Sequence, residues 1–103
     1  MPRAIVLNRD DNVATVIDNG ADIRSNCQLR GERSGSVTLG AAIPYGHKVA
    51  LQDIAAGAEI KKYGLVIGRA TASIATGQHV HVHNVESLRG RGDVAVQPSQ
   101  EAK

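Results

Sequence analysis

The chain has 103 residues, of which 42% are hydrophobic and 21% are charged, so it is long enough for one domain with one modest core. Its formal net charge is only +2, which does not require nucleic acid or another polyanion as a partner. Two tyrosines are its only aromatic residues, which argues against base-stacking platforms and aromatic cages.

The cysteine content and the N-terminal sequence bear on location. The single cysteine, Cys27, cannot form an internal disulfide, and no metal-ligand spacing surrounds it. The N-terminal apolar run at 4–7 is far shorter than the core of a signal peptide, and no stretch approaches the roughly 20 apolar residues that span a bilayer. We therefore expect a cytoplasmic protein with no membrane association.

The first part of the chain predicts strands separated by turns. Residues 3–7 form a short apolar run, and residues 12–17 alternate apolar with small or polar side chains, so both are expected to be strands. An Asn-Gly pair at 19–20 is typical of a tight turn. The segment 24–41 is rich in glycine, serine and other polar residues, and we expect a loop there that carries one short strand at 36–39.

Glycines recur at short intervals in the second part of the chain, where they would interrupt long helices. No window there keeps a helical period over three turns. A single helical turn over 49–56 is compatible with the sequence, but short strands joined by tight turns are the better prediction. From Glu86 onward the chain is polar, so we expect one domain over 1–88, followed over 89–103 by a flexible basic segment and a C-terminal tail.

An internal repeat supports an all-β fold. The segment 53–60 (DIAAGAEI) matches 73–80 (SIATGQHV) at a spacing of 20 residues, and a weaker copy occurs at 17–23. In each copy an apolar residue ends a strand, a glycine suited to positive φ makes the turn, and another apolar residue begins the next strand. The copies are too few for a solenoid, so we expect a compact fold of bent hairpins.

Three histidines alternate with valines in the segment 79–84 (HVHVHN). On a strand, His79, His81 and His83 would share one face, and Val80 and Val82 would share the other. Two imidazoles at positions i and i+2 of a strand can bind one divalent metal. The alternative is a row of solvent-facing histidines on a strand whose valines form the core.

The remaining candidate groups are one histidine and three cations. Gly46 allows the backbone to turn, so His47 and Lys48 would be presented at a corner, where the imidazole could bind a metal or carry a proton and the ammonium could attract a carboxylate. Arg89 and Arg91 are separated by glycine and suit a carboxylate or phosphate. The alternatives are an exposed turn and a solvated linker.

Four segments, taken in order, resemble the SAF-type domain of the altronate and galactarate dehydratases and the related sulfolactate sulfo-lyases. The similarity covers roughly residues 10–88, and it implies a β-clip-like fold of short bent strands. The four segments are IPYGHKVAL at 43–51, DIAAG at 53–57, KYGLVIGRA at 62–70 and HVHNV at 81–85.

The resemblance also implies which residues form the site. The positions that match the family pattern are His47, Lys48, His81, His83 and Asn84. His79 falls at a position where variation is expected. The three histidines of this set are expected to be catalytic, His81 and His83 to bind a divalent metal such as iron or manganese, and Lys48 and Asn84 to contact substrate. Arg89 and Arg91 are also expected to bind substrate.

The activity implied by the resemblance is elimination of water, or of sulfite, from a 2-hydroxy acid with the help of a metal. In fused family members a larger catalytic region follows this domain. We therefore expect the chain to be the small subunit of an altronate- or galactarate-type dehydratase that forms a 2-keto-3-deoxy acid together with a large catalytic subunit, and to be inactive alone.

Three other functions fit the same sequence. The chain could be the alpha subunit of a sulfolactate sulfo-lyase, because the distal end of the substrate would be read mostly by the large subunit. It could be a module that binds a sugar acid or a metal without turnover. It could also be a structural domain that forms homo-oligomers through an exposed strand edge.

Overall fold

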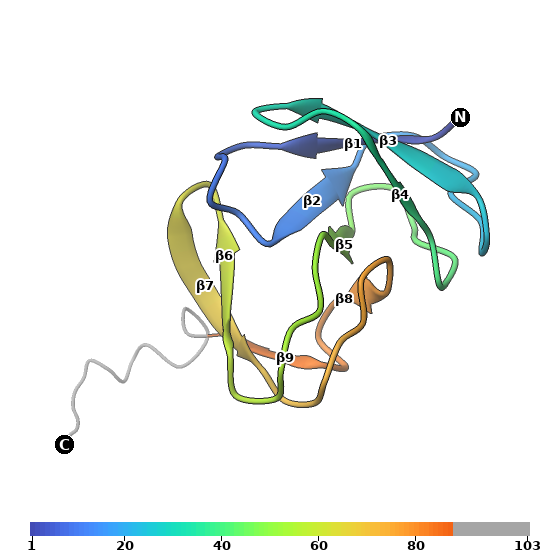
Figure 1. Cartoon of the computed structure of the whole chain (residues 1–103). Coiled ribbons are helices and arrows are strands. Elements are labelled where there is room, and N and C mark those ends of the chain that lie inside the picture. The colour runs from blue at the N-terminus through green and yellow to red at the C-terminus, as the bar shows by residue number, and fades with distance from the viewer. Residues whose placement is uncertain (88–103) are drawn as a thin grey trace, which may run out of the picture.

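The computed structural model of the protein describes residues 1–87, which form nine strands and no helix (Figure 1). The predicted all-β fold is confirmed, and the alternative of a helical turn at 49–56 is not, because a strand occupies the start of that segment. No helix able to cross a membrane occurs among these residues. The strands are β1 (Arg3–Val6), β2 (Val13–Val16), β3 (Asn26–Gly31), β4 (Ser36–Thr38), β5 (Lys48–Ala50), β6 (Glu59–Lys62), β7 (Leu65–Ala70), β8 (His79–Val80) and β9 (Val85–Ser87).

The strands form two sheets. Six strands pair in the order β4-β3-β1-β2-β5-β8, and three pair in the order β6-β7-β9. Every pair is antiparallel except β1 with β3, which run parallel. Figure 1 shows the β6–β7 hairpin beside β2, and β9 running below β8. The two sheets meet where β2 contacts β6.

Two apolar clusters form the core, one for each end of the molecule. Successive side chains of β2 and β5 point to opposite faces of the sheet, so each strand contributes residues to both clusters. Both faces of these two strands are therefore buried. The first cluster contains Ala4, Val6, Ala14, Val16, Ala21, Cys27, Leu29, Val37, Leu39, Ile43 and Val49, and the second contains Val13, Ala50, Ile54, Ile60, Ala70, Ile74 and Val80.

The prediction of a loop over 24–41 with one short strand is wrong for its first part, because β3 occupies Asn26–Gly31. Cys27 and Leu29 are buried and alternate with exposed polar residues. β3 pairs in parallel with β1, and Leu29 lies opposite Ala4. Its other partner, β4, is near in the chain. Only two apolar residues mark β3, so the polar composition of the segment concealed it.

The internal repeat corresponds to paired corners of the chain. In the first pair, the backbone N–H of Ile54 donates to the carbonyl of Ile74 at 2.7 Å, and the reverse bond is 2.8 Å long. Gly57 and Gly77 then take φ values of 87° and 88°, as a tight turn with positive φ at its third residue requires. The 20-residue spacing thus relates two equivalent corners that face each other.

A second pair of corners has the same geometry. Ala21 and Ile43 form the bridge, and Gly46 has a φ of 85°. The remaining corner has Arg24 at the turn with a φ of 71°, so it lies slightly beyond the weak copy at 17–23. This corner was not predicted from the sequence because arginine occupies the position that is glycine in the other corners. The corner at 43–46 was not recognised as a copy of the repeat.

Candidate histidine and lysine site

The pairing of β5 with β8 brings distant histidines together. Lys48 lies opposite Val80, and Val49 lies opposite His79. The same antiparallel register continued by one residue puts His47 opposite His81. His47 follows the positive-φ Gly46, so a corner of the chain delivers it to the end of β8.

His47, His79 and His81 form a compact group, called here the histidine triad. The His47 Nδ1 and His79 Nε2 atoms are 2.8 Å apart, and one ring nitrogen from each of the three residues lies within 4.8 Å of the others. The His47 and His81 rings stack with centroids 4.0 Å apart and an interplanar angle of 15°. His83 is not among the residues whose ring nitrogens lie this close together, although its ring centroid is 5.2 Å from that of His79.

The predicted alternation along 79–83 is wrong beyond Val80, where β8 ends. Val82, expected to share a face with the buried Val80 and placed in the core by the alternative interpretation, is 81% exposed. Residues 81–84 form a turn in which the Asn84 Oδ1 accepts from the His81 N–H at 2.9 Å and its Nδ2 donates to the His79 carbonyl at 2.8 Å. The side-chain amide of Asn84 thus bonds backbone groups at the end of β8 that would otherwise pair with a neighbouring strand. These local bonds compete with continuation of the strand.

Two consequences follow for the predicted site residues. His79, which the resemblance placed at a variable position, belongs to the triad. Asn84, expected to contact substrate, has both polar side-chain atoms bound to the turn that positions His81. A direct contact between Asn84 and substrate stays a prediction.

The surroundings of His79 and His81 favour the neutral imidazole. Burial lowers the pKa of His79, and the neighbouring His47, His83, His81 and Lys48 lower it further. Burial and the charges of His47, Lys48 and His83 likewise lower the pKa of His81. Neutral imidazole binds metal and accepts protons, and three imidazoles make a donor set that suits divalent first-row metals. The triad therefore fits a metal of the kind that the resemblance implies.

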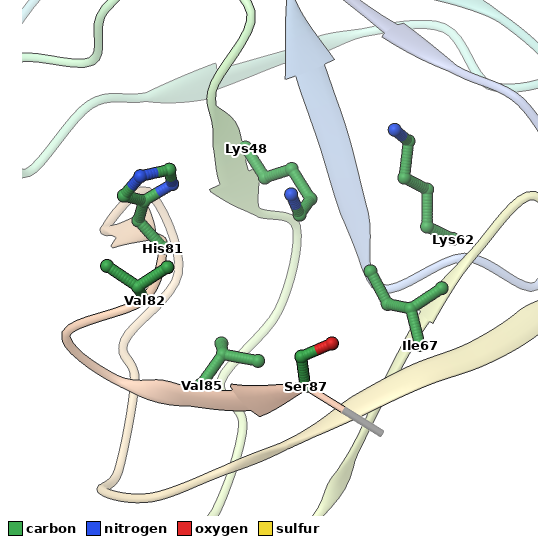
Figure 2. A pocket seen from close by; sticks show the side chains of 7 residues that line it. All are labelled: Lys48, Lys62, Ile67, His81, Val82, Val85 and Ser87. Atoms are coloured by element: carbon green, nitrogen blue, oxygen red, sulfur yellow. The ribbon is translucent and has the colours of Figure 1, made fainter. Parts of the chain in front are cut away.

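A pocket of about 280 Å³ adjoins the triad. Figure 2 shows Lys48 between His81 and Lys62, with the apolar side chains on the facing wall. Burial lowers the pKa of Lys48, and the positive charge of Lys62 lowers it further. The pocket thus combines cationic and apolar walls, and its lining residues are Lys48, Lys62, Ile67, His81, Val82, Val85 and Ser87.

Lys62 was missed in the sequence. It is one of two adjacent lysines at the end of β6, and nothing local distinguishes it from the exposed Lys61. Arg89 and Arg91, which were expected to contact substrate, lie outside the described residues, as does the rest of the predicted segment 89–103. Their roles stay predictions.

Residues 2–88 match the family of the altronate/galactarate dehydratase SAF domain. The chain belongs to this family. The resemblance seen in the four sequence segments is thereby confirmed, and the strands and corners described above agree with the β-clip fold expected of a SAF domain.

Curated relatives of this SAF domain are of two kinds. It is 46% identical over 77 residues to altronate dehydratase of Escherichia coli, and 36% identical over 87 residues to altronate dehydratase of Bacillus subtilis. It is 36% identical over 88 residues to the (2R)-sulfolactate sulfo-lyase subunit alpha of Chromohalobacter salexigens. These alignments cover 75%, 84% and 82% of this chain, respectively.

The two kinds of relative differ greatly in length. The aligned region is 15% of the E. coli dehydratase and 17% of the B. subtilis dehydratase, but 94% of the C. salexigens subunit alpha. The SAF domain thus corresponds to a small part of the first kind and to nearly all of the second.

Proposed function

We propose that this SAF domain is the small subunit of a metal-dependent lyase that acts on a 2-hydroxy acid in the cytoplasm, together with a larger catalytic chain. The observation that carries the proposal is the histidine triad beside a pocket that contains two lysines. The names of the relatives support this class, because they are dehydratases and a sulfo-lyase subunit. The proposed reaction is elimination of water from an altronate- or galactarate-type sugar acid.

The reaction requires removal of a proton from the carbon beside the carboxylate, departure of the β-hydroxyl as water, and tautomerisation of the enol to a 2-keto-3-deoxy acid. A divalent ion such as iron or manganese, held by His47, His79 and His81, would supply positive charge that stabilises the enediolate. Lys48 would bind a carboxylate in the adjoining pocket. His83, beside the triad, would protonate the departing hydroxyl.

A pocket of this size does not enclose a sugar acid on its own. Binding sites for small molecules usually bury most of the ligand, and the pocket lies at the surface of a small domain. We therefore propose that the larger chain completes the site and provides the base. This division of labour makes the SAF domain inactive alone.

A second candidate is the alpha subunit of a sulfolactate sulfo-lyase, in which sulfite is the leaving group. The observation that favours it is similarity, since the chain is 36% identical over 88 residues to the C. salexigens subunit alpha. The histidines and Lys48 would serve the same steps, except that sulfite needs less help from an acid as it leaves.

The proposal is tested by assaying the full chain alone and with a dehydratase- or sulfo-lyase-type large chain. Altronate, galactarate and 3-sulfolactate are supplied with iron or manganese, and keto acid is measured. We expect product only when both chains are present, and the substrate that turns over separates the two candidates. Keto acid from the chain alone contradicts the division of labour, and binding without turnover under every condition indicates a binding module.

The metal ligands are tested by titrating the metal-free full chain with Co²⁺ and recording its visible absorption. Loss of outer-shell partners already costs about 10–100-fold in metal affinity, so His79→Ala and His81→Ala are expected to weaken binding by about 100-fold. His83→Ala is the matched control and is expected to change the affinity little. If His83→Ala weakens binding and His79→Ala does not, the ligands are instead the pair predicted from the sequence.

A further inference from the structure

Lys62 brings a second cation to the pocket from a different sheet. Lys48 is the first residue of β5, in the six-stranded sheet, whereas Lys62 is the last residue of β6, in the three-stranded sheet. Both are half-buried, and both line the pocket that His81 borders. The junction of the sheets therefore determines the spacing of the two ammonium groups.

The two cations have no protein anion to balance them within residues 1–87. No aspartate or glutamate lines the pocket there, and neither ammonium forms a salt bridge with those residues. Like charges that share a partly apolar pocket repel each other and lose hydration. A ligand with two negative charges would offset both costs, whereas a ligand with one would leave a cation unpaired.

The chemistry of the walls restricts this ligand further. Ile67, Val82 and Val85 form the apolar part of the pocket and offer no side-chain hydrogen bonds to a chain of hydroxyl groups. Besides the two lysines, the polar side chains of the lining are His81 and Ser87, which is few for a ligand with many hydroxyl groups. A short acid with an anionic group at each end suits such walls better than a long polyhydroxy monoanion. One end would lie beside Lys48 and the triad, and the other would lie at Lys62.

We propose that Lys62 binds a second anionic group, a carboxylate or a sulfonate, at the end of the 2-hydroxy acid remote from the histidine triad. This proposal rests on the proposed function for the nature of the ligand. It assigns recognition of the remote end to this chain and not only to the larger chain. Lys62 then determines specificity for dianionic over monoanionic hydroxy acids.

The test is an NMR titration of the full chain with three acids that share one core. Lactate has one carboxylate, malate carries a second carboxylate on carbon 3, and 3-sulfolactate carries a sulfonate there. A charge-assisted contact corresponds to about tenfold or more in affinity, so we expect at least one dianion to bind about tenfold more tightly than lactate. The preferred dianion identifies the group that Lys62 binds.

Substitutions at two adjacent lysines make the test specific. Lys62→Met is expected to reduce the preference for the dianion to less than about threefold, and Lys62→Arg is expected to retain it. Lys61→Met removes the same charge from the exposed neighbour and is expected to leave the preference unchanged. An unchanged preference in Lys62→Met, equal binding of lactate and both dianions, or no binding of any acid overturns the proposal.

Failure of this proposal is distinguishable from failure of the proposed function. The titration measures binding, so a preference that depends on Lys62 stands even if no lyase activity is found with any large chain. Conversely, if the two-chain enzyme is active and its KM for the dianion is the same with Lys62→Met, only the role of Lys62 is overturned.

Discussion

Two buried polar residues, Asp11 and Asn12, join the loop after β1 to the β6–β7 hairpin. The Asp11 carboxylate accepts from the backbone N–H groups of Tyr63 and Gly64 at 2.7 and 2.8 Å. The Asn12 side chain donates to the Glu59 carbonyl at 2.9 Å and accepts from a backbone N–H of β6. These bonds hold the hairpin that carries Lys62, so they fix one wall of the pocket from a distance.

Asp11→Ala is expected to destabilise the fold by about 3 kcal/mol, because it removes a buried carboxylate that accepts from three backbone N–H groups. Urea unfolding of the full chain measures the change. Asp10→Ala is the matched control, since Asp10 is exposed, and its effect is expected to stay within about 0.5 kcal/mol. Equal effects of the two substitutions would contradict a structural role for the buried carboxylate.

Asp53 gives the fold a dependence on acid pH. Its Oδ1 accepts from the backbone N–H and the hydroxyl of Thr76, both at 2.9 Å, and these bonds hold the pKa of Asp53 below its usual 3.8. The folded state thus favours the carboxylate, so the stabilisation is present above about pH 3.8 and is lost as the pH falls through the lower pKa of the folded state.

The expected result is that Asp53→Ala lowers Tm at pH 6, and that the difference from the native chain shrinks as the pH is lowered towards 3. Thermal unfolding followed by circular dichroism at a series of pH values measures it. A difference in Tm that stays constant down to pH 3 would show that the ionised form contributes nothing.

At the scale of elements, the corners contribute more than the strands to positioning the triad. β8 has only two residues and β5 only three, so neither has enough backbone pairing to position the triad by itself. The corner at Gly77 leads directly into β8, and its backbone packs against the strand that contains Thr38. A Cβ at Gly77 would clash with the Thr38 carbonyl oxygen, whereas a Cβ at Gly57 would meet nothing within 4 Å.

Gly77→Ala is therefore expected to destabilise the fold more than Gly57→Ala. Both glycines have nearly the same positive φ, which costs an alanine about 1 kcal/mol in each case. The clash at Gly77 is expected to add about 2 kcal/mol. Urea unfolding of the two variants gives the comparison, and equal losses would show that only the backbone conformation matters at these corners.

At the scale of the whole molecule, the candidate site forms where the two sheets meet. β5, β8 and the residues that flank them carry the triad and Lys48. The sheet of β6, β7 and β9 supplies Lys62, Ile67 and Val85. The pocket lies at the surface, beside the exposed Val82. A larger chain that covered this face would complete the site and bury these side chains.

Arg89 and Arg91 belong to the same scale, because we predict that they contact a carboxylate of the larger chain or of the substrate. The segment 89–93 has no apolar residue with a large side chain, so charge is the interaction available to it. Replacing both arginines by alanine is expected to weaken association or raise KM in the two-chain enzyme and to leave the Tm of the isolated chain nearly unchanged. A clear loss in Tm would instead make the arginines part of the fold.

The sequence by itself determined the features that depend on neighbouring residues. The turns at Gly57 and Gly77, the absence of long helices over residues 1–87 and the membership of the family were all predictable. Local sequence carries the turn geometry, and the family segments are continuous. His47 and His81 were also selected as candidate site residues from those segments, and their functional roles stay predictions.

Only the tertiary structure decided which side chains share the site. β3 was missed because it has only two apolar residues, Cys27 and Leu29, and one of its two partners, β1, is distant in sequence. The predicted run 79–83 failed because the Asn84 side chain diverts the backbone after Val80. His79 joins the triad through the register of β5 with β8, and Lys62 reaches the pocket from the second sheet. Pairing between strands that are far apart in sequence has no local signature. Composition and spacing could therefore indicate candidate residues for the site but not which of them lie together.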